Sequence, residues 1–229
     1  MTIGAPTDLT ADLSHVDTWL FDLDNTLYPA ESGLMKQVEA RMTEFVIKVT
    51  GLPREEAYAL QKRYLAEHGL TLGGLIANHG VAPEDFHAQF HDLSLDALAH
   101  EPELLAALER LPGRRLIFTN ADEKHAVRVL DHLRLSHLFD DVFHIHSFGF
   151  APKPSAEGFQ RMIDDHGVDA AATAFFEDSE RNLAPAAALG MTTVLVGVHA
   201  PASSASFVHH RTEKLAPFLS NARLKEPAR

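Results

Sequence analysis

A short apolar run that ends in two closely spaced carboxylates constrains this chain most. Residues 16–21 are mostly apolar, and Asp22, Asp24 and the turn-forming Pro29 follow them. A buried strand has this pattern where it leaves the carboxyl edge of a parallel sheet, the edge at which open α/β folds bind ligands. A turn there would let the two acids converge with different tasks. Asp22 could then act as a nucleophile and Asp24 as an acid/base.

Beyond residue 102 the sequence alternates between amphipathic stretches and short apolar runs. Helices are expected at 103–111, 123–133, 155–166 and 180–189, and strands at 116–118, 142–143, 174–176 and 193–196. Strands that alternate with helices of about 10–15 residues are typical of a doubly wound parallel sheet. We therefore predict an α/β fold with a Rossmann-like core.

Residues 33–99 show helical periodicity and no strand signal, which indicates an inserted helical module. We expect helices at 34–49 and 54–67, a glycine-bearing turn at 69–74, a short helix at 75–78 and another after Pro83. The predicted organisation is a discontinuous core (1–32 and 100–200), the helical insertion (33–99) and a C-terminal tail (201–229). The tail is expected to hold a short helix at 213–219 and then a frayed, polar end.

Composition excludes several classes of protein. The formal net charge of −12 argues against a nucleic-acid polymer or an anionic membrane as partner. The chain has no cysteine, which excludes disulfides, thiolate catalysis and cysteine-ligated metals. Residues 1–14 lack the pattern of a signal peptide, and Pro185 and Gly190 interrupt the uncharged stretch 183–200, so no membrane span is expected. We expect a cytoplasmic protein, and the sequence gives no indication of its oligomeric state.

Polar side chains gather where four of the predicted strands, or the loops after them, end. They are Asp22 with Asp24, Thr119 with Asn120, Lys153, and Glu177 with Asp178. Taken singly, such residues are common helix caps, turn residues or solvated charges. Their recurrence at one edge of the predicted sheet favours a shared site.

The chemistry of this set suits phosphoryl transfer. Up to four acids at one edge repel one another and call for a counter-ion, and all-oxygen ligands suit Mg²⁺. Such a metal would lie among Asp22, Asp24, Glu177 and Asp178. Lys153 would add a fixed positive charge, and Thr119 and Asn120 would donate to phosphate oxygens. Asp22 would become an aspartyl-phosphate that water then hydrolyses.

These clusters resemble the four motifs of the haloacid dehalogenase superfamily, in its phosphatase branch, over about residues 19–198. The first motif resembles residues 22–26, the second Thr119-Asn120, the third Lys153, and the fourth Glu177-Asp178 with Asn182. The resemblance implies a Mg²⁺-dependent phosphomonoesterase that acts on a small phosphorylated substrate. It implies that Asp22, Asp24 and Asp178 bind the metal, with Glu177 as a further candidate ligand because an aspartate is more usual at its position. It also implies that the insertion is a type-one helical cap, which closes over the site, excludes water and selects the substrate.

Within that superfamily the sequence most resembles pyrimidine 5′-nucleotidase-like phosphatases. Residues 24–29, 118–121 and 190–192 look like theirs, and residues 71–75 resemble their Thr-Leu-Arg-Gly-Leu segment, with Gly73 where arginine is usual. This resemblance implies pyrimidine nucleoside 5′-monophosphates as substrates. Without the arginine, the segment lacks a guanidinium group, whose paired N–H donors suit a phosphate or a nucleobase, and the physiological substrate stays open. His91-Asp92 also resembles a cap pair of this group, for which a surface helix end is the simpler interpretation.

Several alternatives stay open. A phosphatase or phosphomutase acting on sugar phosphates or phosphoglycolate would use the same residues. A haloacid dehalogenase shares the nucleophile but needs no metal, so it would gain little from Asp24 and the acids of the fourth motif. A signalling receiver domain gathers similar residues in about half the length. A catalytically silent, ligand-binding relative is disfavoured by the intact pair of acids in the first motif.

The many histidines do not form a recognisable zinc motif. His144 and His146 are spaced to share one face of a strand, and His209 and His210 are adjacent. A zinc site needs three or four convergent ligands. Solvated or hydrogen-bonded histidines are the simpler interpretation in both places.

Overall fold

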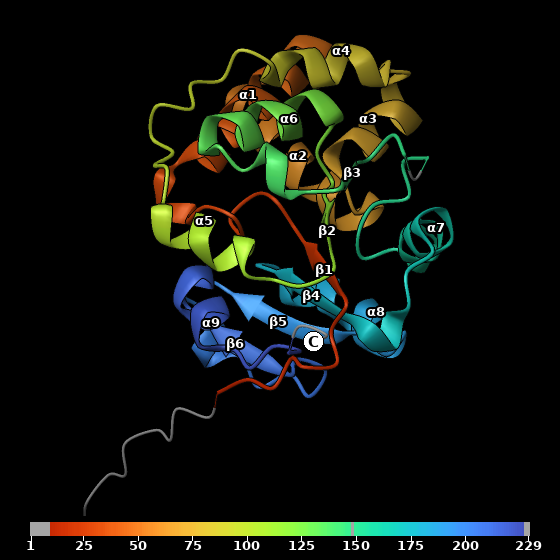
Figure 1. Cartoon of the computed structure of the whole chain (residues 1–229). Coiled ribbons are helices and arrows are strands. Elements are labelled where there is room, and N and C mark those ends of the chain that lie inside the picture. Colours follow the sequence, from red (N-terminus) through yellow and green to blue (C-terminus); the bar gives the residue numbers. More distant parts are fainter. Residues whose placement is uncertain (1–9, 148, 227–229) are drawn as a thin grey trace, which may run out of the picture.

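Six parallel strands form the centre of the molecule. The computed structural model describes residues 10–147 and 149–226. The strands lie in one sheet, in the order β3-β2-β1-β4-β5-β6 (Figure 1). They are β1 (Thr18–Phe21), β2 (Arg114–Phe118), β3 (Asp141–Phe143), β4 (Thr173–Glu177), β5 (Thr192–Val196) and β6 (His210–Thr212). The predicted parallel α/β fold is confirmed.

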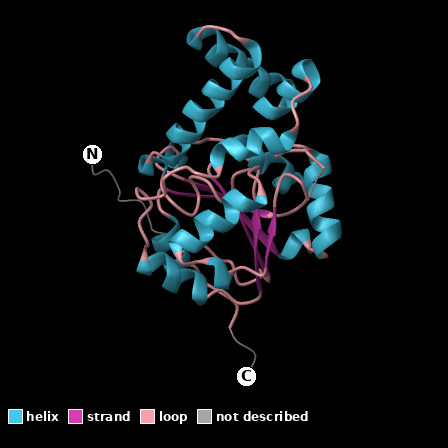
Figure 2. Ribbon diagram, turned by 90° about the horizontal axis from the view of Figure 1, so that it is seen from above, coloured by secondary structure: helices cyan, strands magenta, loops and turns pink. Residues whose placement is uncertain are grey.

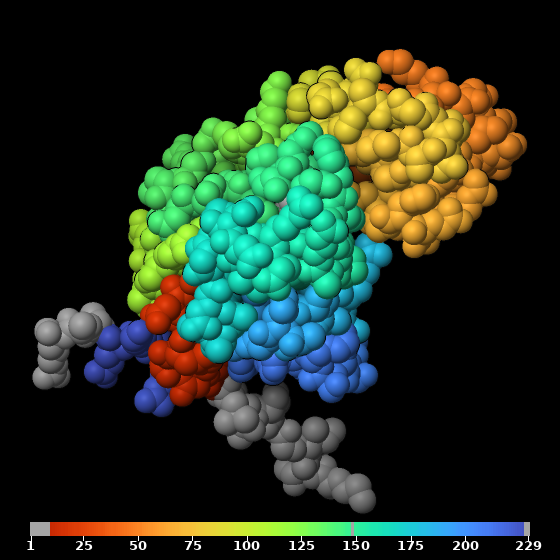
Figure 3. All heavy atoms as spheres, turned by 90° about the vertical axis from the view of Figure 1, so that its right-hand side faces the viewer, coloured from red at the N-terminus to blue at the C-terminus, as the bar shows by residue number. Residues whose placement is uncertain are grey.

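Helices surround this sheet, as the view from above shows (Figure 2). The α-helices are α1 (Leu34–Thr50), α2 (Arg54–His68), α3 (Thr71–His79), α4 (Pro83–His87), α5 (Pro102–Glu109), α6 (Glu123–Leu133), α7 (Ala156–His166), α8 (Glu180–Ala188) and α9 (Leu215–Asn221). Short 3₁₀ turns are η1 (Ala30–Ser32), η2 (Ala88–Phe90), η3 (Ser136–Leu138), η4 (Ala170–Ala172) and η5 (Ala200–Ala202). Elements α1 to α4 and η2, here called the cap lobe, bulge from one side of the body in orange and yellow (Figure 3). No helix in the described ranges is long and apolar enough to cross a bilayer.

Both faces of the sheet are buried, which explains its nearly continuous apolar strands. Successive strand residues point to opposite faces. Trp19 and Phe21 pack in a core with residues of α5, α6 and α9, whereas Leu20 packs in a second core with residues of α7 and α8. The sheet is therefore a rigid middle layer whose polar strand ends are held in place from both sides.

The strand order reverses at β1. From β1 the chain builds β2 and β3 on one side and then crosses over to place β4 on the other side. In open α/β sheets such a reversal leaves a crevice at the carboxyl ends of the strands, where ligands bind. Asp22 directly follows β1 and Glu177 ends β4, so the fold brings these two acids to that crevice.

The predicted turn over residues 69–74 is wrong from Thr71 onward, where α3 already begins. Gly74 lies inside α3 where this helix meets α2, and a β-carbon there would lie 2.2 Å from Cγ of Tyr64. Close packing of the two helices outweighs the low helix propensity of glycine.

The C-terminal region is more ordered than expected. Residues 210–212 form β6, an edge strand where no strand was predicted. The frayed end is wrong for residues 222–225, because Arg223 pairs with the N-terminal segment: its N–H donates to Ala11 O and its carbonyl accepts from Leu13 N, both at 2.9 Å. The signal-peptide prediction falls largely on residues 1–9, outside the described residues.

Candidate active site

A buried lysine lies at the centre of the polar cluster. Lys153 is 1% exposed, and its Nζ donates to Asp22 Oδ1, Glu177 Oε2 and the carbonyl of Phe118, each at 2.7 Å. These bonds use all three ammonium protons and join the ends of β1, β2 and β4. Burial would lower the pKa of Lys153, but the two carboxylates outweigh it and raise the pKa, so the lysine stays charged.

Thr119 and Asn120 lie beside this lysine, at the end of β2. The Asn120 amide pairs with the main chain of Lys153, accepting from its N–H at 2.9 Å and donating to its carbonyl at 3.1 Å. One Nδ2 hydrogen is left for a ligand. Thr119 Oγ1 accepts from Ala121 N at 3.0 Å, which leaves the hydroxyl proton free to donate. Both residues border the cleft described below.

Three acids form a compact cluster at the same edge. Each of the three acids, Asp22, Glu177 and Asp178, contributes one carboxylate oxygen, and these three oxygens lie within 4.8 Å of one another. Burial raises the pKa of Asp22 to about 7, and the charge of Glu177 adds to this effect. Burial also raises the pKa of Glu177 to about 7, although Lys153 opposes it. Acids that resist ionisation in this way are stabilised by a nearby cation, so the cluster could hold a metal ion.

Asp24 points to other partners. Its Oδ1 accepts hydrogen bonds from Tyr28 Oη at 2.5 Å and His125 Nε2 at 2.9 Å. Burial would raise the pKa of Asp24, but the charge and hydrogen bond of His125, with the Tyr28 bond, outweigh it and lower the pKa. Among the described residues its carboxylate does not join the metal-binding group, so ligation by Asp24 stays a prediction.

The turn after β1 separates the two acids of the first motif. Asn25 has φ of 61°, in the left-handed region that asparagine tolerates better than most residues. Its Nδ2 donates to Asp178 Oδ2 at 3.1 Å, and Thr26 Oγ1 donates to Asp22 Oδ2 at 3.3 Å. This turn lets Asp22 face Lys153 while Asp24 faces Tyr28.

A cleft of about 560 Å³ lies between the strand ends and the cap lobe, and the predicted site residues border it. The cap side of the cleft is mixed. Its apolar side chains are Met35, Val38, Met42, Leu65, Leu70, Leu72, Phe86 and Phe90, and its polar ones are Lys36, Glu39, Gln61, Lys62, Thr71 and His87. Gly73 is not among the lining residues, and a β-carbon there would lie 3.0 Å from His68 Cβ. A side chain at position 73 would therefore first require His68 to move.

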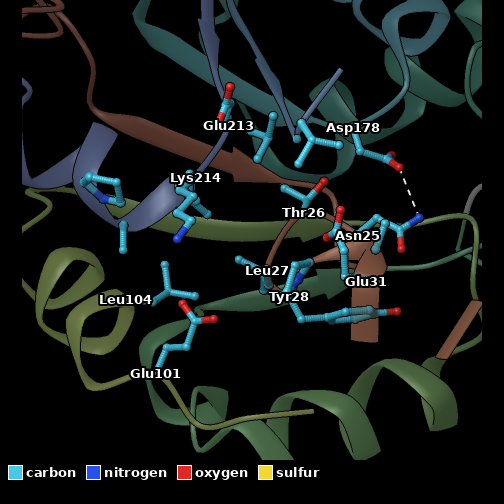
Figure 4. A pocket seen from close by; sticks show the side chains of 18 of the residues that line it. Asn25, Thr26, Leu27, Tyr28, Glu31, Glu101, Leu104, Asp178, Glu213 and Lys214 are labelled. Atoms are coloured by element: carbon cyan, nitrogen blue, oxygen red, sulfur yellow. Dashed lines mark hydrogen bonds between the residues drawn. The ribbon is translucent and has the colours of Figure 1, made fainter. Parts of the chain in front are cut away.

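A second cavity, of about 580 Å³, lies on the other side of the first loop (Figure 4). Residues 25–31 border it together with the beginnings of α5 and α9, and the hydrogen bond from Asn25 to Asp178 lies at its edge. Asp22, Lys153 and Thr119 line the cleft and do not line this cavity. The candidate chemistry therefore belongs to the cleft.

Comparison with known proteins decides the family. A model of haloacid dehalogenase-like hydrolases matches residues 16–190. This chain is a haloacid dehalogenase-like hydrolase. The predicted superfamily is thus confirmed, and the finer resemblance to pyrimidine nucleotidases stays a prediction.

Known relatives of this haloacid dehalogenase-like hydrolase differ in their reactions. Phosphate metabolism protein 8 of Saccharomyces cerevisiae is 29% identical over 193 residues, which cover 77% of this chain and 60% of the yeast protein. This chain thus spans about three fifths of that relative. A HAD phosphatase from Thermococcus onnurineus has a TM-score of 0.63 at 18% identity and covers 91% of this chain and 100% of its own. A 2-haloacid dehalogenase from Pseudomonas syringae pv. Tomato DC3000 has a TM-score of 0.55 at 20% identity, and the match covers 90% of this chain and 97% of the dehalogenase. These likenesses show the fold, and the reaction must be argued from the site.

Contacts between the cap lobe and the core of this hydrolase were not predicted. His87 Nδ1 and His91 Nε2 lie 3.2 Å and 3.4 Å from Asp122 Oδ2, at the start of α6. His91 lies at the end of η2, as the helix-end interpretation expected, but its side chain is only 25% exposed and faces Asp122. Asp92 is exposed and pairs with Arg41. The N-cap pattern of Asp122 was a signal for the helix start, but nothing in the sequence linked it to the cap.

The predicted strand face for His144 and His146 is wrong. Strand β3 ends at Phe143, so both residues lie in the loop beyond it, with ring centroids 5.9 Å apart. His209 is hydrogen-bonded, as expected, because its Nδ1 accepts from Thr193 N at 3.0 Å.

Proposed function

We propose that this hydrolase is a Mg²⁺-dependent phosphomonoesterase that works through an aspartyl-phosphate on Asp22. The observation that carries the proposal is the position of Lys153 Nζ, 2.7 Å from both Asp22 and Glu177, two acids that cluster with Asp178. A nucleophile, a fixed cation and an acid cluster thus meet at one strand edge. This combination can bind a phosphoryl group and stabilise the charge that develops during in-line transfer.

The residues present fit Mg²⁺. Asp22, Glu177 and Asp178 offer only oxygen ligands, within 4.8 Å of one another, as this ion prefers. When bound, Mg²⁺ would neutralise charge on the phosphoryl oxygens and on these acids. The raised pKa values of Asp22 and Glu177 support the same assignment, because crowded acids ionise more readily beside a cation.

The chain's own residues divide the reaction between them. Asp22 attacks phosphorus while the bond to the leaving oxygen breaks, and Asp24 gives that oxygen its proton. Asp24 then takes a proton from the water that attacks the aspartyl-phosphate, and cleavage of the P–O bond to Asp22 restores the carboxylate. Thr119 and Asn120 would donate to the phosphoryl oxygens throughout, and Lys153, whose three protons already have acceptors, would attract these oxygens with its positive charge.

We further propose nucleoside 5′-monophosphates, most of all pyrimidine ones, as substrates. The cap side of the cleft offers two phenylalanines, Phe86 and Phe90, and other apolar side chains that suit a planar base better than a sugar alone. Sugar phosphates, phosphoglycolate and a phosphomutase reaction are the alternatives. A cytoplasmic location stays a prediction.

Phosphate release across a small substrate panel tests this function. The panel holds CMP, UMP, AMP, GMP, phosphoglycolate and sugar phosphates, each with Mg²⁺ and with EDTA, and Asp22→Asn is the control. We expect Mg²⁺-dependent release that is fastest with CMP and UMP and absent in the variant. Release that survives in EDTA or in Asp22→Asn would contradict the proposal. Metal-independent halide release from 2-haloacids would assign a dehalogenase instead.

A further inference from the structure

The two hydrogen bonds that hold Asp24 end on the same oxygen. Tyr28 Oη lies 2.5 Å and His125 Nε2 lies 2.9 Å from Oδ1. Within residues 10–147 and 149–226, no hydrogen bond reaches Oδ2. Asp24 borders the cleft, so Oδ2 is the oxygen available to exchange a proton with a bound group. A carboxylate held by one oxygen keeps the other in a fixed orientation for proton transfer.

His125 is itself held in place. It is 5% exposed and lies in the first turn of α6. Its main-chain N–H donates to Oδ1 of Asp122, the N-cap residue, at 2.9 Å. Oδ1 of Asp24 is an acceptor both when the carboxylate is ionised and when Oδ2 carries the proton, so Nε2 must carry the proton in the bond between them. The imidazole therefore acts as a donor whose position is fixed by the start of a helix.

Asp122, which accepts the hydrogen bond from the His125 main chain, also contacts two histidines at the end of the cap lobe. Oδ2 of Asp122 lies 3.2 Å from His87 Nδ1 and 3.4 Å from His91 Nε2. Burial would raise the pKa of Asp122, but the hydrogen bonds from His87 and His125 outweigh it and hold the pKa below its usual range. Asp122 thus stays ionised and connects the cap lobe to the turn that carries His125.

We propose that His125, together with Tyr28, is a positioning residue that orients Oδ2 of Asp24 toward the leaving oxygen of the substrate. The proposal rests on the proposed function, because it gives Asp24 the task of the acid. It adds that this acid depends on a histidine from α6 and on the aspartate that the cap contacts.

The dependence of rate on the leaving group tests this role. An alkyl phosphate leaves as a strongly basic alkoxide and needs the proton from Asp24, whereas p-nitrophenyl phosphate leaves as a stable anion and needs it little. General acid catalysis contributes about 10²–10⁴-fold. Asp24 also serves as the base in the later hydrolysis of the aspartyl-phosphate, which both substrates share, so the comparison uses kcat/KM, which reports only the steps up to formation of this intermediate. We expect His125→Asn to lower kcat/KM about 10-fold or more with the best alkyl phosphate of the panel and to change kcat/KM for p-nitrophenyl phosphate by less than about 3-fold.

Two further variants separate positioning from folding. The amide nitrogen of glutamine can reach the place of Nε2, whereas that of asparagine lies nearer Nδ1, so His125→Gln should restore much of the lost rate. Tyr28→Phe removes only the other donor and should show the same selective loss, which keeps the test decisive if His125→Asn does not fold. His132→Asn is the matched control, because the hydrogen bond of this exposed histidine of α6 within the described part of the chain is to Leu98 O, at 3.1 Å, away from Asp24. It should leave both rates unchanged.

Equal losses with both phosphates, or His125→Gln no better than His125→Asn, would overturn the positioning role and leave the phosphatase assignment intact. Absence of Mg²⁺-dependent phosphate release from the wild-type protein would contradict the proposed phosphatase function itself. That result would remove the proposed function and this inference together.

Discussion

Replacing Lys153 with methionine should destabilise the protein strongly at alkaline pH. Methionine keeps much of the lysine stem but removes the ammonium that lies 2.7 Å from both Asp22 and Glu177, and all three side chains are buried. Removing one partner of a buried ion pair costs about 3–5 kcal/mol of unfolding free energy. For a chain of this size about 1 kcal/mol corresponds to about 2–4 °C in Tm. We therefore expect Tm to fall by about 6–20 °C at pH 8.

The loss should be much smaller at acidic pH. The pKa values of Asp22 and Glu177 are about 7 with the lysine present, and Lys153 lowers both, so they rise when it is removed. At pH 5.5 both carboxyls are then mainly protonated and no longer need the ammonium. Calorimetry in EDTA at pH 8 and pH 5.5 measures the difference directly.

Lys225→Met is the matched control for this experiment. Lys225 pairs with Asp17 at 2.8 Å, but both side chains are 54% exposed. Exposed pairs contribute about 0–1 kcal/mol, so the control should change Tm little at either pH. If Lys153→Met lost no more stability than Lys225→Met at pH 8, or lost as much at pH 5.5, the charge assignment of the site would be wrong.

Three further predictions follow from the same contacts. Because Asp22 and Glu177 titrate near 7 in the native state and near 4 when unfolded, the native protein binds more protons in between, and metal-free stability should fall as pH rises from about 4 to 7. Mg²⁺ should raise Tm more at pH 8 than at pH 5.5, and an equal shift would argue against these acids as its ligands. Asp24→Asn should lower kcat about 10²–10⁴-fold, and its Mg²⁺-induced Tm shift tests the predicted metal ligation: loss of the shift would support the Asp24 carboxylate as a ligand, and an unchanged shift would exclude it. Gly74→Ala should cost about 1–3 kcal/mol in urea unfolding, because its β-carbon would meet Tyr64 at 2.2 Å, and wild-type stability would refute that packing.

Apolar patterning predicted the strands that are buried on both faces. Strands β1, β2, β4 and β5 carry short apolar runs, such as residues 19–21 and 174–176. Such runs are typical of central strands in a parallel sheet, because both faces of these strands are buried. Strand β6 escaped prediction because His210, Arg211 and Thr212 are only half-buried at the sheet edge. Its pairing with β5 comes from the fold and not from a local pattern.

Some features of the candidate site could likewise be predicted from the sequence, and others could not. Residues that directly follow strands, such as Asp22 and Thr119, could be predicted because parallel strands end at one edge. The bond between His125 and Asp24 spans 101 residues of sequence, and the contact of His87 with Asp122 depends on how the cap lobe packs. One sequence contains no signal for such contacts, so the surroundings of Asp24 required the structure.

Chemical trapping of Asp22 tests the central claim most directly. The enzyme is mixed with the best substrate of the panel and Mg²⁺, quenched within a turnover and treated with borohydride, which reduces an acyl phosphate. Mass spectrometry of the peptide that contains residues 16–29 should show the reduced side chain at position 22 in wild type and none in Asp22→Asn. Phosphate release without modification at Asp22, or with modification at another residue, would contradict the account.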